Sequence, residues 1–277
     1  MLVGLRYVLE AAAERRGAVG AFNVFSLEHG EAIVTGAEQA GMPVVLQISQ
    51  NAVRYHGGLE PVLLATLALA RNADVPAVVH LDHITDERLA REGIALGATS
   101  LMYDGSKQPF EDNLATTAAL VEHAHAHGVD VEAELGEVGG KDGVHAPGVR
   151  TDPAEAAKFA AATGVDALAV AVGSSHAMVE ETAELDVDLI GRLRSAVAVP
   201  LVLHGASGVP DAGLVAAARA GMVKINIATQ LNMAFTAALR IALAADPRVV
   251  DSRTYLAPAR DAVSVEVTRL LELIGGA

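Results

Sequence analysis

The chain has 277 residues, of which 52% are hydrophobic, 19% charged and only 3% aromatic. This composition excludes a disordered chain and favours one large domain whose core is built from Ala, Val, Leu and Ile. The formal net charge of −14 argues against nucleic acid or an anionic membrane as the main partner. Because there is no cysteine, disulfides and thiolate metal sites are excluded, and any metal site must use histidine and carboxylate ligands.

The first residues do not resemble a targeting signal. Charged residues from Glu10 to Arg16 interrupt the apolar stretch that a signal peptide needs. No uncharged apolar run is long enough to span a bilayer. We therefore expect a cytoplasmic protein.

Short apolar runs alternate with alanine-rich amphipathic segments along the whole chain. After a first helix over 2–16, the pattern predicts eight strands, over 18–23, 43–48, 76–81, 98–103, 128–134, 165–171, 199–203 and 222–226. Helical patterns fill the intervals, most clearly at 27–40, 109–126, 152–163, 210–220 and 228–245, and a last helix covers 258–274. Eight alternating strand–helix units predict an α/β fold, a single-domain TIM (β/α)8 barrel over residues 1–277.

Residues 136–150 break this alternation. The segment GEVGGKDGVHAPGVR is glycine-rich, poor in apolar residues and longer than an ordinary strand–helix loop. It is either a simple surface loop or a lid. Because it follows the fifth strand, at the end of the barrel where active sites lie, we favour the lid.

Polar residues stand where six consecutive strands end. They are Asp82 with His83, then Asp104, Glu134, His176, His204 and Asn226. In a parallel barrel all these strand ends point to one face, which is the catalytic face. Three histidines from three strands can meet one metal ion, and neutral imidazoles suit Zn²⁺ with a position left open for substrate. Each histidine alone would more simply be a hydrogen-bonded strand-end residue, but three beside carboxylates favour a metal site.

The turns after the seventh and eighth strands are built for an anion. The first reads HGASG (204–208) and the second NIAT (226–229), and each leads into a predicted helix. Small residues and helix N-termini present backbone N–H groups to a phosphate, and these two loops are the common phosphate site of the fold. Two ordinary capped turns are the alternative; beside a metal site, the pair indicates a phosphorylated substrate.

Other residues receive a simpler interpretation. His123, His125 and His127 lie near a helix C-terminus, which favours positive charge without any metal. His80 alternates with Asp82 and is expected to support the site from inside the barrel. Lys224 could form a Schiff base, as in a metal-independent aldolase, but it lacks the neighbours that such chemistry needs.

At these residues the chain resembles the class II, zinc-dependent fructose-1,6-/tagatose-1,6-bisphosphate aldolase family, and it is most similar to the tagatose-type branch. The longest similar stretches cover nearly the whole chain: GAFNVFSLEHGEAIVTGAE (20–38), HLDH (80–83), LMYDGSKQPFEDNL (101–114), VEAELGEVGG (131–140), GVDALAVAVGSSH (164–176), LVLHGASGVP (201–210), VKINIATQL (223–231) and SRTYLAPAR (252–260).

The resemblance implies a role for each matching residue. Asp82 moves the proton of the C4 hydroxyl group, His83, His176 and His204 bind zinc, and Asp104 and Glu134 support the metal or bind it transiently. Dihydroxyacetone phosphate is held by Ala177, Gly205, Ala206, Ser207, Asn226, Ile227, Ala228 and Thr229. The lid acid is Asp142 or Glu137, and Arg253 reaches the distal phosphate. The family also implies a monovalent cation, Na⁺ or K⁺, and a homodimer or homotetramer.

Two departures from the family pattern concern the pocket wall. Ile84 stands where the family usually has Gly or Ala, and the GSSHAM motif (173–178) replaces a Gly-Thr-x-His-Gly pattern followed by an aromatic residue and Lys. The metal set is intact, so these changes bear on the aldehyde partner and on phosphate binding.

The expected reaction is reversible aldol cleavage of fructose or tagatose 1,6-bisphosphate to dihydroxyacetone phosphate and an aldehyde such as glyceraldehyde 3-phosphate, a lyase step of carbohydrate metabolism and glycolysis. Alternatives are a class II aldolase for another phosphorylated keto sugar or keto-deoxy sugar acid, a metal-dependent epimerase or hydrolase on the same barrel, or a non-enzymatic subunit. The lack of a His-x-His pair after the first strand argues against a hydrolase, and three converging histidines argue against a non-enzymatic scaffold.

Overall fold

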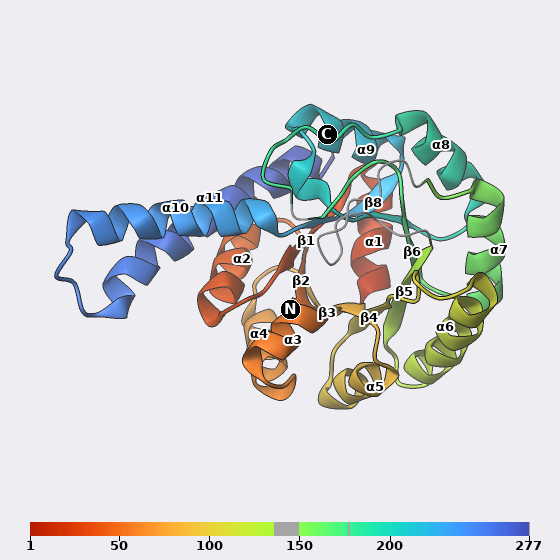
Figure 1. Cartoon of the computed structure of the whole chain (residues 1–277), viewed down its shortest axis with the longest axis horizontal. Helices are drawn as coiled ribbons and strands as arrows, with labels where there is room; N and C mark the ends of the chain where they lie inside the picture. Colours follow the sequence, from red (N-terminus) through yellow and green to blue (C-terminus); the bar gives the residue numbers. More distant parts are fainter. Residues whose placement is uncertain (136–149, 177, 277) are drawn as a thin grey trace.

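A computed structural model describes residues 1–135, 150–176 and 178–276. Its centre is a closed barrel of eight parallel strands in sequence order, with β8 hydrogen-bonded to β1 (Figure 1). The strands are β1 (Val19–Asn23), β2 (Val44–Ser49), β3 (Ala77–Ile84), β4 (Ser100–Tyr103), β5 (Asp130–Leu135), β6 (Ala167–Val170), β7 (Leu201–Leu203) and β8 (Met222–Ile227). The predicted (β/α)8 barrel is confirmed.

Helices surround the barrel and connect its strands. They are α1 (Leu5–Glu14), α2 (Leu27–Ala40), α3 (Gln50–His56), α4 (Glu60–Asn72), α5 (Glu87–Leu96), α6 (Phe110–His125), α7 (Pro153–Thr163), α8 (Val187–Ala196), the short 3₁₀ helix η2 (Ala206–Gly208), α9 (Asp211–Ala220), α10 (Thr229–Ala245) and α11 (Ser252–Ile274). Among the residues described, no helix has the length and apolar character to cross a membrane.

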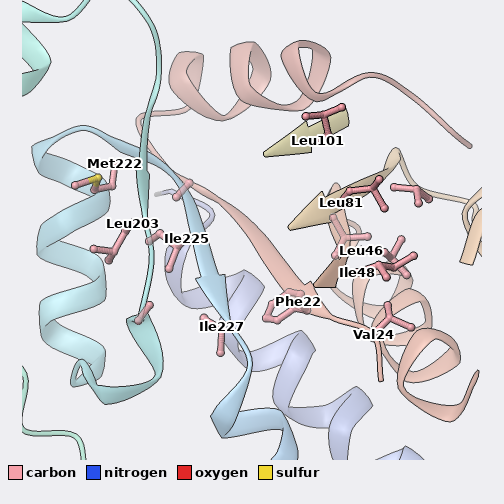
Figure 2. Packing of buried hydrophobic residues seen from close by; sticks show 14 of the residues in the cluster. Phe22, Val24, Leu46, Ile48, Leu81, Leu101, Leu203, Met222, Ile225 and Ile227 are labelled. Atoms are coloured by element: carbon pink, nitrogen blue, oxygen red, sulfur yellow. The ribbon is translucent and has the colours of Figure 1, made fainter. Parts of the chain in front are cut away.

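Two apolar layers follow from the alternation of side chains along each strand. Outward-facing residues such as Phe22, Leu46 and Ile225 pack against the helices in the larger layer (Figure 2). Inward-facing residues such as Val45 and Met102 form a second, smaller cluster inside the barrel. Successive side chains of a strand point to opposite faces, so one short strand contributes to both layers.

Helix α1 closes the amino-terminal end of the barrel. Its Leu5, Val8 and Leu9 are fully or almost fully buried against the inward-facing strand residues. Arg6 donates from Nε to the carboxylate of Asp130 at the start of β5, at 2.8 Å. The apolar plug at this end confines the polar residues of the barrel interior to its middle and to the opposite, carboxyl end.

Helices α10 and α11 form an arm that extends away from the barrel (Figure 1). Helix α11 begins earlier than the last helix predicted over 258–274, because it starts at Ser252 and carries Pro258 inside it. Asp251 caps this start by accepting from the N–H of Arg253. A proline in a helix cannot bond the carbonyl four residues back, and its ring crowds that carbonyl. Here the carbonyl belongs to Thr254, an exposed residue in the first turn of α11.

The base of the arm is anchored by a close approach of α2 and α11. A Cβ added at Gly36 would lie 2.6 Å from the backbone oxygen of Ser264 and 2.7 Å from Cβ of Val267. Thr268 Oγ1 also donates to the Gly36 carbonyl at 3.1 Å. The absence of a side chain at Gly36 therefore sets the distance between the two helices.

This packing predicts opposite effects of one substitution at two helical glycines. Gly36→Ala should lower the free energy of unfolding by about 1–3 kcal/mol, since backbone atoms cannot move aside easily. Gly191→Ala, in α8, should raise it by about 0.5–1 kcal/mol, because nothing lies within 4 Å of the added Cβ. Urea unfolding of both variants tests this; equal effects would contradict the close approach.

Candidate active site

The predicted site residues meet at the carboxyl ends of the strands. Asp82 and His83 lie at the end of β3, Glu134 lies at the end of β5, and Asn226 lies near the end of β8. Asp104, His176 and His204 occupy the loops that follow β4, β6 and β7. The parallel barrel thus brings together residues that are as far as 144 positions apart in the sequence, from Asp82 to Asn226.

A strained backbone at His83 aims two consecutive residues at the site. The register between β3 and β4 shifts between Leu81 and Ile84, and His83 has a φ of +50°. Side chains of adjacent strand residues normally point to opposite faces, but an irregularity of this kind re-aims one of them. A non-glycine residue with positive φ costs about 1–3 kcal/mol, which the surrounding structure must offset.

The three histidine rings converge. Ring centroids are 5.0 Å apart for His83 and His176, 4.7 Å for His83 and His204, and 5.9 Å for His176 and His204. Nδ1 of His204 lies 3.0 Å from Nε2 of His83. One nitrogen from each ring can be chosen so that all three lie within 4.8 Å of one another, which is suitable for a shared metal ion.

Carboxylates hold the far side of His83. Asp104 Oδ2 lies 2.9 Å from Nδ1 of His83, and Glu134 Oε2 lies 3.8 Å from the same atom. Asp104 is itself held by Ser106, which donates to Oδ1 from its hydroxyl at 2.6 Å. His83, Asp104 and Glu134 form a second group whose ligand atoms lie within 4.8 Å of one another.

The sequence analysis missed Glu132, which lies below the histidines inside the barrel. Its Oε1 is 2.8 Å from Nε2 of His204, and its Oε2 accepts from Lys224 Nζ at 2.8 Å. A signal was present, because Glu132 alternates with Glu134 on β5 and must point to the same face. The ion pair also engages the Lys224 ammonium, which argues against Schiff-base chemistry there.

Burial favours the neutral form of the two fully buried histidines, His80 and His204. Burial holds the pKa of His204 well below its usual value, and the neighbouring His83 lowers it further. Burial and then the Lys224 ammonium do the same to the pKa of His80, whose Nδ1 lies 2.8 Å from Ser100 Oγ. A neutral imidazole keeps one nitrogen lone pair, which is the form that binds metal.

Asp82 is buried and incompletely hydrogen-bonded. Its Oδ2 accepts from the amide of Asn23 at 3.5 Å, and that amide's oxygen accepts in turn from Gln47 at 3.1 Å. Its Oδ1 is buried with no hydrogen-bond partner among the described residues, and the same holds for Oδ1 of Asn226. Unsatisfied buried oxygens at the mouth of a barrel mark places where a ligand can bond.

The loops after β7 (204–208) and β8 (226–229), which the sequence predicts to bind an anion and which we call the anion loops, lie against each other. Ser207 Oγ accepts from the backbone N–H groups of Ala228 and Thr229, at 3.2 and 3.1 Å. Gly205 has a φ of +67°, and a Cβ there would lie 2.6 Å from the backbone of Ser175, so the loops after β6 and β7 approach closely. Glycine is needed for both reasons.

Some predicted residues fall elsewhere. The side chain of Ile227 packs outward in the apolar layer (Figure 2), so only its backbone faces the site. Ala177 and the lid segment, with Glu137 and Asp142, lie outside the described residues. Arg253 lies in the first turn of α11, paired with Asp251 at 2.8 Å. The arm formed by α10 and α11 extends away from the barrel (Figure 1).

Comparison with known proteins identifies the family of this chain. The family model described as "Fructose-bisphosphate aldolase class-II" matches residues 3–277. The fructose-bisphosphate aldolase of Geobacillus stearothermophilus is 41% identical over 270 residues, covering 96% of this chain and 94% of the relative. A probable fructose-bisphosphate aldolase of Bacillus subtilis is 42% identical, covering 96% and 95%.

A solved structure extends the similarity to three dimensions. The crystal structure of the YdjI aldolase from Escherichia coli K12 superposes with a TM-score of 0.87 at 32% sequence identity, covering 100% of this chain and 98% of that one. The expected family is therefore confirmed along the whole barrel. With the histidine cluster, the carboxylates and the anion loops in the expected places, the chain belongs to the class-II fructose-bisphosphate aldolase family.

Proposed function

We propose that this chain is a metal-dependent lyase that reversibly cleaves a ketose 1,6-bisphosphate to dihydroxyacetone phosphate and an aldehyde such as glyceraldehyde 3-phosphate. One observation carries the proposal: nitrogens of His83, His176 and His204 gather within 4.8 Å of one another at the mouth of the barrel. Asp82, an acid for proton transfer, reaches the same end of the barrel on the neighbouring position of β3. The relatives' names point to the same reaction.

The residues fit a divalent cation, and Zn²⁺ suits three imidazoles best. Asp104 and Glu132 accept only, so they assign N–H to Nδ1 of His83 and Nε2 of His204. The lone pairs of Nε2 of His83 and Nδ1 of His204 then face each other at 3.0 Å, an arrangement that a cation between them stabilises. When bound, the ion would polarise the substrate carbonyl as a Lewis acid.

Asp82 is the proposed acid–base residue. In cleavage it takes the proton of the C4 hydroxyl group as the C3–C4 bond breaks, and in condensation it returns that proton. Asn23 holds one carboxylate oxygen, and the other has no partner among the described residues. The carboxylate is therefore positioned with one oxygen free to accept from substrate.

The phosphate of dihydroxyacetone phosphate is proposed to bind between the two anion loops. A protein with a net charge of −14 must hold such a dianion through local groups. The backbone N–H groups of Gly205–Ser207 and the N-terminal end of α10 would supply them, and Asn226 would position the keto end. The N–H groups of Ala228 and Thr229 bond Ser207 Oγ and would have to leave it to reach a phosphate. A monovalent cation near this phosphate, and Asp142 or Glu137 as the lid acid, remain predictions, as does the cytoplasmic location.

We also propose that the arm joins copies of the chain into a homodimer or homotetramer. It exposes large apolar side chains, with Ile241 71% and Val250 94% exposed, together with Met233 and Leu243. Exposed apolar surface of this kind marks interaction sites. Arg253 lies at the end of the same arm, so a contact with the distal phosphate would be made in the site of a second copy.

A coupled assay for dihydroxyacetone phosphate tests the reaction. We expect release from fructose 1,6-bisphosphate, tagatose 1,6-bisphosphate or both, stopped by EDTA and restored by Zn²⁺. The ratio of the two rates identifies the preferred ketose, which one or two contacts of about 1–3 kcal/mol decide. Turnover that continues after the metal has been removed to below the enzyme concentration would contradict the proposal.

Two single variants separate metal binding from proton transfer. His204→Ala should lose bound zinc and lower kcat by on the order of 10³-fold or more, because Lewis-acid stabilisation is worth several kcal/mol. Asp82→Asn should keep its zinc and lower kcat by about 10²–10⁴-fold. Metal content is measured on the same samples as activity. An Asp82→Asn enzyme with normal kcat would remove Asp82 from the mechanism.

Complementation tests the role of the arm. Arg253→Ala and Asp82→Asn subunits are each expected to be poorly active alone. In a mixed dimer, one site has Asp82 and receives Arg253 from the other chain, so random mixing should restore about a quarter of the wild-type rate. No recovery after mixed dimers are verified would contradict a contribution from a second copy, and a monomer in solution would contradict the oligomer itself.

A further inference from the structure

Glu132 occupies a position between a charged lysine and a proposed metal ligand. One carboxylate oxygen lies 2.8 Å from Lys224 Nζ, and the other lies 2.8 Å from Nε2 of His204. All three side chains have zero exposure. Burying a carboxylate is costly unless it is paired and hydrogen-bonded, and here both oxygens are engaged. The arrangement occupies the middle of the barrel, where apolar side chains would otherwise fill the space.

Asn226 and His83, which also contact the His204 ring, do not determine which of its two nitrogens carries the proton. The amide nitrogen of Asn226 lies 3.3 Å from Nδ1 and 3.1 Å from Nε2. His83 approaches only Nδ1, through its own Nε2 at 3.0 Å. Among the described side chains hydrogen-bonded to the ring, Glu132 is the one that carries a carboxylate, and it faces Nε2. A carboxylate at that nitrogen requires the N–H to be there, which leaves the lone pair on Nδ1.

We propose that Glu132 is a positioning residue for the metal, which holds His204 in the tautomer that offers Nδ1 to the ion, and that Lys224 orients Glu132 by occupying its second oxygen. The inference rests on the proposed metal site. Asp104 contacts Nδ1 of His83 in the same way that Glu132 contacts Nε2 of His204. Two imidazoles are then oriented by two different carboxylates: Asp104 in the loop after β4, and Glu132 inside the barrel.

The Lys224 ammonium determines which way the side chain at position 132 is oriented. With Glu132 replaced by Gln, the ammonium would take the amide oxygen, and the amide NH₂ would turn towards His204. A donor at Nε2 favours the opposite tautomer, with the lone pair directed away from the metal. If Lys224 is then replaced by Met, the amide oxygen is released to accept from Nε2 again. His80 is the other titratable group facing Glu132, with its Nε2 4.0 Å away, and it is unchanged in each variant.

The experiment measures zinc affinity by competition with a chromogenic chelator. Glu132→Gln should weaken zinc binding by about 10–100-fold, the usual effect of losing a group that orients a ligand. Glu132→Gln with Lys224→Met should recover most of that loss. Asp130→Asn is the matched control, because it removes another buried carboxylate of β5 that pairs with Arg6 at the opposite end of the barrel. Its zinc affinity should equal that of the wild type.

A second measurement does not depend on the folding of any variant. Nitrogen-15 NMR of the metal-free wild-type protein should show His204 with its proton on Nε2, and Zn²⁺ should shift the Nδ1 signal. The opposite tautomer, or a double variant that binds zinc more weakly than Glu132→Gln, would overturn the inference. Wild-type protein that binds no zinc would refute the proposed metal site itself. A Glu132→Gln variant that binds zinc as tightly as the wild type would instead refute only the role of Glu132.

Discussion

The alternation of side chains along eight parallel strands is the constraint on which the structure depends. Every second residue of a strand points into the barrel, and the interior is too narrow for anything but side chains. At the amino-terminal end these residues are small or apolar and are closed off by α1. Towards the carboxyl end they become Glu132, His80, Asp82 and Asn226. The same periodicity that builds the core therefore also builds the site.

A regular barrel alone would not assemble this site. Asp82 and His83 are adjacent, so regular β-structure would direct one of them to the helices. The positive φ of His83 and the register shift beside it bring both to the barrel mouth. Gly205, which has a positive φ and no Cβ, lets the loop that carries His204 approach the loop after β6 closely. The strain at His83 is local to the site, and the surrounding barrel must offset it.

Electrostatics reconcile an acidic protein with an anionic substrate. Lys224, a basic side chain inside the barrel, is already paired with Glu132. Three imidazoles gather at the barrel mouth, and burial lowers the pKa of one of them, His204. In our proposal, backbone N–H groups, which carry no formal charge, bind the phosphate. Positive charge would then come chiefly from the cation, so metal binding and substrate binding would depend on one another.

The sequence by itself determined the barrel, the eight strands and the residues at their carboxyl ends, because hydrophobic periodicity and strand-end position are local properties. It also identified the family, through motifs such as HLDH and LVLHGASGVP. It did not identify Glu132, whose role depends on contacts with Lys224, 92 positions away, and with His204, 72 positions away. It predicted that Arg253 reaches the distal phosphate but not that Arg253 stands in the first turn of α11, paired with Asp251, from where it would reach the site of a second copy. Only the tertiary structure decided these points, because pairings between distant strands and the direction of a projecting helix pair leave no periodic signal in the chain.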